Sequence, residues 1–391
     1  MSVLFDCTMC GKKARQAPPW KCKCGGILEV IQDLEALAGE IDDARELFDS
    51  RLGSRVPPYS SGVWRFKELI HPTIALSQVI TRGEGGTGLY SSTNVSSFAG
   101  SNLLLKHDGE NPTASFKDRG MTVGISEAVR QGAKTVACAS TGNTSSSLAA
   151  YAAIAGLHCK VFIPKGKISS GKLFQTIAYG AEVVQLEGNF DDAMRQVQLD
   201  AAQNGTYLLN SLNPWRIEGQ KTVALEIFQQ LEWKTPDWIA LPAGNLGNTS
   251  AVGKAIVEAK KLGLIDRIPR IASVQATGAN PFYSMWKNGS LQPTPVSEPH
   301  TIASAIQIGN PVSWKKAIGA IKNTNGVVTQ VTDEEIIAAK RVIDSAGIGC
   351  EPASAASVAG TRKLVLEGVI DKSETVACIL TGNLLKDPVI R

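Results

Sequence analysis

From about residue 100 onward, short apolar runs alternate with longer amphipathic or alanine-rich stretches, and this alternation constrains the fold most. The apolar runs have the length of β-strands, and they lie at residues 102–107, 134–139, 159–164, 182–187, 238–243, 271–276 and 375–380. The stretches between them have the length and pattern of helices, and they include residues 144–155, 191–204, 216–232, 248–262, 333–346 and 353–367. Strands that alternate with helices favour parallel βαβ units. We therefore expect an α/β fold with open, doubly wound, mostly parallel sheets.

Length and charge limit the classes of function. A chain of 391 residues buries roughly three quarters of its unfolded surface, so its core needs no disulfide staples. The 40 basic and 36 acidic residues are interspersed, which predicts neither a nucleic-acid nor a membrane partner but a small-molecule substrate. No apolar run approaches the roughly 20 residues that span a bilayer, and Met1–Cys7 does not resemble a secretion signal. These observations predict a cytoplasmic protein.

In open α/β sheets, ligands bind at the carboxyl ends of the strands, so the loops there are the candidate sites. The loop 111–120 follows the first strand and places Lys117 at the start of a helix, next to Arg119. The positive potential at this position favours the neutral amine, which is a nucleophile for carbonyl groups. A lone lysine is more often a solvated surface residue, but the flanking Ser115, Phe116 and Gly120 argue against that interpretation.

Three further loops follow predicted strands. Residues 140–147 are rich in hydroxyl groups and open a helix, which suits a carboxylate or phosphate but also a simple N-cap cluster. Residues 242–250 contain Gly244 and Gly247, whose backbone N–H groups can form an anion-binding nest, although they do not match the glycine pattern of dinucleotide binders. Thr381 follows the last strand, where a capping threonine is the commoner explanation.

Together these four loops resemble the fold type II family of pyridoxal-phosphate enzymes, and within it most of all the threonine synthases. The resemblance runs from about residue 80 to residue 391 and depends on the order and spacing of the motifs. It implies that Lys117 carries the cofactor covalently and is the catalytic acid and base. It also implies that Asn143 binds the cofactor's ring hydroxyl and that Thr381 faces the pyridine nitrogen. The cofactor's phosphate would rest on Gly244, Asn245, Leu246, Gly247 and Asn248.

A further segment, residues 210–222, is similar to the substrate-phosphate region of that family. By this resemblance, the phosphate and carboxylate of O-phosphohomoserine would be bound by Ser140, Thr141, Thr144, Asn210, Ser211, Asn213 and Arg216. Arginine suits the task because its planar fork matches a phosphate bidentately. The implied reaction yields threonine and phosphate from O-phosphohomoserine and water, in a homodimer. Cysteate synthase, acting on phosphoserine and sulfite, and less closely threonine dehydratase, are the alternatives on the same scaffold.

The amino-terminal segment contains four closely spaced cysteines in a C-x2-C-x11-C-x-C pattern: Cys7, Cys10, Cys22 and Cys24. Such thiolates suit tetrahedral zinc in a structural site, although the second pair is one residue shorter than usual. We expect a zinc-ribbon-like segment over residues 1–32 and a catalytic region over 33–391. Within that region, a smaller domain of about 118–225 would be inserted in a larger one of about 60–117 and 226–391. A zinc-ribbon module that binds nucleic acid or protein is the alternative from another class, but it leaves the rest of the chain unexplained.

Overall fold

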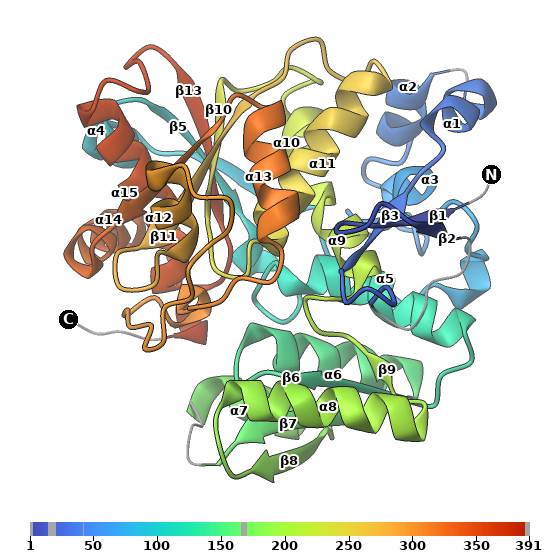
Figure 1. The fold of residues 1–391 in the computed structure, drawn as a ribbon. Helices are drawn as coiled ribbons and strands as arrows, with labels where there is room; N and C mark the ends of the chain where they lie inside the picture. The colour runs from blue at the N-terminus through green and yellow to red at the C-terminus, as the bar shows by residue number, and fades with distance from the viewer. Residues whose placement is uncertain (1–2, 15–20, 42, 166–169, 388–391) are drawn as a thin grey trace. The chain divides into compact units, whose positions relative to one another are not determined.

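The computed structural model describes residues 3–14, 21–41, 43–165 and 170–387 (Figure 1). The chain divides into two compact units. The first consists of residues 1–86 and 117–220, and the second of residues 87–116 and 221–391. The domain limits expected from the sequence stay a prediction. No helix in the described ranges is long and apolar enough to cross a membrane.

The first unit begins with a small antiparallel sheet of three strands in the order β2-β1-β3. Its strands are β1 (Leu4–Cys7), β2 (Lys13–Ala14) and β3 (Leu28–Ile31). The short helices α1 (Leu34–Glu40), α2 (Ala44–Ser50) and α3 (Lys67–Ile70) follow. Asp33 and Asp43 begin α1 and α2 because each carboxylate accepts backbone N–H groups of the first turn.

The main sheet of the first unit is parallel, in the order β8-β7-β6-β9. Its strands are β6 (Thr135–Ala139), β7 (His158–Pro164), β8 (Glu182–Leu186) and β9 (Tyr207–Leu208), and its helices are α5 (Lys117–Arg130), α6 (Asn143–Ala155), α7 (Ser170–Ala178), α8 (Phe190–Asn204) and α9 (Pro214–Gln220). Val136 and Cys138 of β6 join one apolar core, whereas Ala137 and Ala139 join another core with α8. Both faces of β6 are therefore covered, as the unbroken apolar run predicts.

The second unit contains a six-stranded sheet in the order β12-β11-β10-β13-β5-β4, parallel except for β4. Its strands are β4 (Leu89–Ser91), β5 (Asn102–His107), β10 (Trp238–Pro242), β11 (Arg270–Ala276), β12 (Val327–Val331) and β13 (Thr375–Leu380). Its helices are α4 (Thr93–Ala99), α10 (Thr222–Gln230), α11 (Gly247–Lys261), α12 (Pro281–Asn288), α13 (Trp314–Asn323), α14 (Asp333–Ser345) and α15 (Pro352–Leu366). Most of α15 is buried in the core, which requires its many small residues.

The predicted fold class, α/β with two mostly parallel sheets, is confirmed. The thiols of Cys138, Cys159, Cys350 and Cys378 are buried in the structure. The single helix predicted over 216–232 is wrong, because the chain forms α9 and α10 there. Gly219 lies so close to α5 that a Cβ atom would sit 1.8 Å from the Arg119 carbonyl oxygen. Helix α9 thus packs on α5, whereas α10 packs on α11. The two helices therefore have different packing partners.

Candidate active site

The loop that carries the candidate lysine is held by backbone hydrogen bonds to the loop after β13. Phe116 donates its N–H to the Thr381 carbonyl over 2.9 Å, and Asn383 donates to the Ala114 carbonyl over 3.0 Å. Between these two bonds, Ser115 pairs with Gly382 as an antiparallel bridge. The structure places Lys117 directly after this clamped loop, as the half-buried first residue of α5. The position at the start of a helix is as expected.

Arg216 of α9 is a buried cation in the first unit. Its side chain is 1 % exposed, and Nη1 donates to the carbonyl of Leu209 over 3.2 Å. Its Nε and Nη2 atoms have no hydrogen-bond partner among the described residues. Loss of water around the guanidinium lowers the pKa of Arg216 to about 10. A buried hydrogen-bond donor without an acceptor destabilises the folded protein. An anion that accepts hydrogen bonds from Nε and Nη2 would remove this cost, so the buried arginine is suited to bind one.

The hydroxyl-rich loop after β6 leads into α6 without a side-chain cap, so its first backbone N–H groups face the loop. Ser140 accepts the N–H of Gly142 through its hydroxyl over 3.1 Å. Asn143 is buried as the first residue of α6, and Thr141 and Thr144 are half-buried beside it. The loop therefore presents hydroxyl and N–H donors at the carboxyl edge of the sheet, as an anion site requires.

The two asparagines of the 210–222 segment are engaged in holding the backbone. The Asn210 amide exchanges two hydrogen bonds of 2.9 Å with the N–H and carbonyl of Ala139, at the end of β6. Asn213 donates to the Leu208 carbonyl over 3.0 Å and accepts the N–H of Trp215 over 3.0 Å. Both side chains thus fix the loop that precedes Arg216, while Ser211 is half-buried. Direct contact of these residues with substrate stays a prediction.

The loop after β10 forms the candidate phosphate cradle in the second unit. Leu246 has a left-handed backbone, with φ of 65°, and it precedes α11. Gly244 lies close to the backbone of Ile306, so that a Cβ atom would sit 3.1 Å from the Ile306 Cα. Asn248 is 6 % exposed, and neither polar atom of its side chain has a partner among the described residues. An unpaired buried amide at the start of a helix suits an anionic ligand.

Thr381 lies at the carboxyl end of β13, and its hydroxyl is 3.1 Å from the hydroxyl of Ser354 on α15. The Ser354 hydroxyl also accepts the N–H of Gly382 over 2.9 Å. Ser354 lies in an alanine-rich helical stretch without a motif, so the sequence alone does not indicate a role for it. Only the contact across the fold identifies it.

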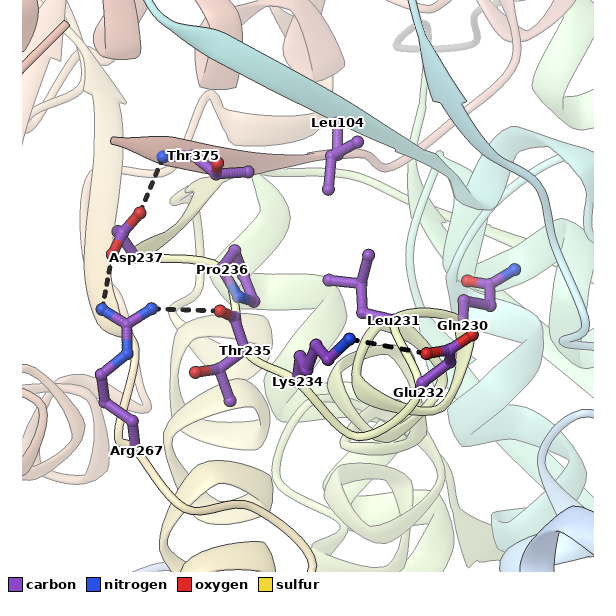
Figure 2. Close-up of a pocket in the computed structure, with 10 residues that line it drawn as sticks. All are labelled: Leu104, Gln230, Leu231, Glu232, Lys234, Thr235, Pro236, Asp237, Arg267 and Thr375. Atoms are coloured by element: carbon purple, nitrogen blue, oxygen red, sulfur yellow. Dashed lines mark hydrogen bonds and ion pairs between the residues drawn. The ribbon is translucent and has the colours of Figure 1, made fainter. Parts of the chain in front are cut away.

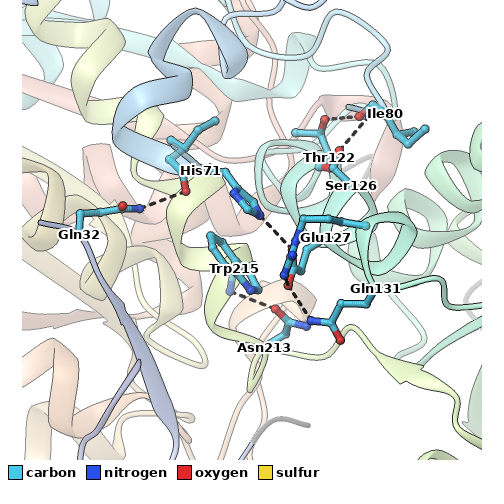
Figure 3. Close-up of polar contacts among 11 residues, drawn as sticks. Gln32, His71, Ile80, Thr122, Ser126, Glu127, Gln131, Asn213 and Trp215 are labelled. Carbon is cyan, nitrogen blue, oxygen red and sulfur yellow. Dashed lines mark hydrogen bonds and ion pairs between the residues drawn. The ribbon is translucent and has the colours of Figure 1, made fainter. Parts of the chain in front are cut away.

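A buried polar cluster supports the start of α9 (Figure 3). The ring of His71 stacks on Trp215 with a centroid distance of 4.0 Å and an interplanar angle of 9°. His71 Nε2 lies 3.0 Å from a carboxylate oxygen of Glu127 on α5, and Gln131 donates to the same carboxylate over 2.6 Å. Because Trp215 directly precedes Arg216, the cluster fixes the backbone from which the buried arginine extends.

An open hollow of about 550 Å³ lies at the opposite, amino-terminal edge of the large sheet (Figure 2). Its wall includes Asp237 before β10 and Thr375 at the start of β13. Asp237 is already paired with Arg267 over 2.5 Å and accepts the N–H of Thr375 over 2.8 Å. The predicted site residues of this unit lie beyond the other ends of these strands, so the hollow does not contain them.

The four amino-terminal cysteines form a cluster at the small sheet, with Cys7 at the end of β1 and the other three outside its strands. All four Sγ atoms lie within 4.8 Å of one another, with 3.4 Å between Cys7 and Cys24 and 3.7 Å between Cys10 and Cys22. Burial alone would raise the pKa of the Cys7 thiol. The backbone N–H groups of Cys10 and Met9 and the neighbouring thiols outweigh that effect, and the pKa falls to about 6.

Comparison with known proteins agrees with this geometry. Residues 80–382 match the family model described as "Pyridoxal-phosphate dependent enzyme". The threonine synthase of Methanocaldococcus jannaschii is 45% identical, with 99% of this chain and 93% of that protein covered. The threonine synthase of Methanosarcina acetivorans is 46% identical, with coverages of 98% and 92%.

Solved structures of lower identity share the fold. Maize serine racemase has a TM-score of 0.67 at 21% identity, over 82% of this chain and 92% of that chain. Threonine deaminase isoform 2 from Solanum lycopersicum has a TM-score of 0.66 at 21% identity, over 87% and 90%. The similarity in sequence to the two threonine synthases covers nearly the whole chain. The chain belongs to the pyridoxal-phosphate dependent enzymes and, within that family, to the threonine synthases.

Proposed function

We propose that this enzyme converts O-phosphohomoserine and water to threonine and phosphate, with Lys117 as its catalytic residue. The observation that carries the proposal is the buried guanidinium of Arg216, whose Nε and Nη2 have no partner among the described residues. The phosphate dianion of a phosphorylated substrate can accept hydrogen bonds from these two nitrogen atoms. The membership in the threonine synthases supports the same substrate.

The donor set of the second unit fits pyridoxal phosphate. The backbone N–H groups of Gly244–Asn248 and the unpaired Asn248 amide would hold its phosphate at the start of α11. Thr381 would place its hydroxyl at the pyridine nitrogen, and Asn143 would bind the ring hydroxyl. Lys117 would supply the amine that joins the cofactor. Its backbone follows directly on the loop that Phe116 fastens to Thr381.

The residues of this chain would bind the substrate and transfer protons to and from it. The cofactor, when bound, stabilises negative charge on substrate carbon atoms next to its ring. Lys117 Nζ would remove the proton at the α-carbon and then one at the β-carbon, and would return protons as the product forms. Arg216 would hold the phosphate group as it leaves the γ-carbon, and water adds at the β-carbon. Ser140, Thr141 and Thr144 would donate to the remaining anionic oxygens of the substrate.

We also propose a structural zinc ion bound by Cys7, Cys10, Cys22 and Cys24. Zinc–sulfur bonds of about 2.3 Å in a tetrahedron place the sulfur atoms roughly 3.8 Å apart. The distances of 3.4 and 3.7 Å between the two cysteine pairs fit this spacing. Gly26 fits the same site, because a Cβ atom there would lie 2.6 Å from the Cys7 Sγ.

Finally, we propose a homodimer, which sedimentation of the purified chain tests.

Product analysis tests the proposed reaction. Purified enzyme with pyridoxal phosphate is incubated with O-phosphohomoserine, and threonine and inorganic phosphate are measured. The expected result is one threonine for each phosphate released. Parallel incubations contain phosphoserine with sulfite, and threonine alone. Formation of cysteate or of 2-oxobutanoate at a higher rate than threonine would contradict the proposal and favour the alternative reactions.

A further inference from the structure

Ser354 makes an unusual set of contacts with the loop after β13. Its side chain is 0 % exposed, and it lies in the first turn of α15. Its hydroxyl is 3.1 Å from the Thr381 hydroxyl, 2.9 Å from the Gly382 nitrogen and 3.3 Å from the Gly382 carbonyl oxygen. One serine therefore contacts three polar groups of two successive residues.

The hydrogen-bonding capacity of a hydroxyl limits how these contacts are used. A serine hydroxyl has one proton to donate and two lone pairs to accept with. The Gly382 N–H occupies one lone pair of Ser354, so the single proton is directed either to the Gly382 carbonyl or to the Thr381 hydroxyl.

The Gly382 carbonyl oxygen has two lone pairs and already accepts one hydrogen bond, so distance decides between the two acceptors. The N–H of Glu351 donates to it over 3.0 Å, which is shorter than its 3.3 Å distance from Ser354. The Thr381 hydroxyl oxygen is nearer to Ser354, at 3.1 Å. The better position for the Ser354 proton is therefore on the bond to Thr381.

The direction of this bond determines what Thr381 can do. A threonine hydroxyl that accepts from Ser354 keeps its own proton available for another acceptor. A threonine hydroxyl that donates to Ser354 can only accept from a further partner. The same pair of side chains thus presents either a donor or an acceptor to a third group.

We propose that Ser354 is a positioning residue that holds Thr381 as a hydrogen-bond donor toward the pyridine nitrogen of the cofactor, which then carries no proton. This inference rests on the proposed function, which places Thr381 at that nitrogen. The loop that presents Thr381 is fastened on its other side by Phe116, so the threonine cannot easily move to find another donor. Ser354 acts through Thr381 and does not touch the substrate.

The chain offers a matched control for Ser354. Ser357 lies one turn further along α15 and is equally buried. Its hydroxyl donates to the Ser354 carbonyl over 2.8 Å, within the helix. A Ser357→Ala substitution therefore removes a buried hydroxyl from the same helix, but it leaves the hydroxyl pair of Ser354 and Thr381 intact.

The first measurement is the affinity of the full-length apoprotein for pyridoxal phosphate, followed by fluorescence. Ser354→Ala is expected to raise the dissociation constant about tenfold, because one hydrogen bond at the ring loses its support. Ser357→Ala is expected to leave the constant within twofold of the wild type. Equal constants for the two variants would overturn the proposal. Thermal unfolding of both apoproteins shows whether they are folded.

The second measurement is the protonation state of the cofactor's ring nitrogen in the wild type and in Ser354→Ala. The wild-type enzyme is reconstituted with cofactor labelled with ¹⁵N in the pyridine ring, and the nitrogen chemical shift is recorded. The proposal predicts a shift in the range of unprotonated pyridine, and in Ser354→Ala a movement toward the protonated range. A protonated nitrogen in the wild type would overturn the role assigned to Ser354.

Different results would contradict the role of Ser354 and the proposed function. A wild-type enzyme that forms threonine and binds the cofactor, but in which Ser354→Ala behaves like Ser357→Ala, contradicts only the role of Ser354. A wild-type chain that binds no cofactor contradicts the proposed function and this inference together.

Discussion

The backbone N–H of Phe116 donates to the carbonyl oxygen of Thr381 over 2.9 Å. This bond joins the loop after β5 to the loop after β13, and the two strands are parallel neighbours in the sheet. The residue directly before Lys117 is therefore fixed to the residue expected at the cofactor's ring nitrogen. The lysine begins its helix from a fixed point of the sheet edge, which limits where its amine can reach.

Substitution of Arg216 by methionine is expected to stabilise the folded protein and to weaken its binding of phosphate. Among the described residues, the buried guanidinium has a single neutral acceptor, so an apolar side chain of similar length should raise the free energy of unfolding by about 1–4 kcal/mol. The same variant should lose stabilisation by inorganic phosphate, which at 100 times its dissociation constant is worth about 2.7 kcal/mol. Thermal unfolding with and without phosphate measures both effects.

Arg216→Lys is the matched variant for this test. It keeps the positive charge but loses the planar fork, so we expect weaker stabilisation by phosphate than in the wild type. If phosphate stabilises Arg216→Met as much as the wild type, then Arg216 does not bind the substrate phosphate.

The stability of the first unit should depend on pH through His71. Burial lowers the pKa of His71 below its usual value of 6.5, and this effect outweighs the neighbouring Glu127, which favours the charged ring. Below about pH 6.5 the unfolded chain therefore binds a proton that the folded chain resists. Stability is full above that pH and falls as the pH decreases toward the folded pKa of His71.

Glu127 acts in a lower pH window. Burial opposes its ionisation, but hydrogen bonds from Arg130, His71 and Gln131 outweigh burial and lower its pKa to about 2. Its contribution is therefore lost only below about pH 4.5.

In thermal unfolding between pH 5.5 and 7.5, His71→Gln should show a smaller loss of stability on acidification than the wild type. His158→Gln, which changes an exposed histidine, should behave like the wild type. Equal slopes for all three proteins would contradict the role of His71.

The cysteine cluster should hold one zinc ion per chain when the protein is purified under reducing conditions. Structural zinc contributes on the order of 10 kcal/mol to the folding of small modules, so chelation should expose the amino-terminal sheet to proteases. Cys10→Ser should lower the zinc content, whereas Cys159→Ala, which changes a buried thiol in another part of the fold, should not. Elemental analysis of the three proteins measures this, and a wild type without zinc would argue against the site.

The position of several candidate loops at the carboxyl edge of the sheet could be predicted, because parallel strands place their loops in a regular way. Lys117, the Gly244–Asn248 loop and Thr381 all follow predicted strands of the large sheet, and the structure has strands at those places. Local sequence is sufficient here, since the strand pattern determines which edge of the sheet each loop occupies.

Contacts between distant segments could not be predicted in the same way. The sequence around Ser354 indicates only a small-residue helix, and its contact with Thr381 depends on how α15 packs beneath β13. The helix is interrupted between Gln220 and Thr222, where α9 packs on α5 and α10 packs on α11, and no signal in residues 216–232 shows this break. The stacking of His71 on Trp215 joins a connecting segment to α9 and likewise depends on tertiary structure.

Covalent capture of the cofactor on the protein shows whether Lys117 carries it. Borohydride reduces the bond between a lysine amine and the cofactor's aldehyde to a stable one, and mass spectrometry of the digested protein then locates the modified residue. We predict modification of Lys117 in the wild type and none in Lys117→Ala, which should also lack the visible absorption of the loaded enzyme and its activity. Modification of another lysine, such as the buried Lys106 or Lys221, or activity in Lys117→Ala, would show that Lys117 does not have this role.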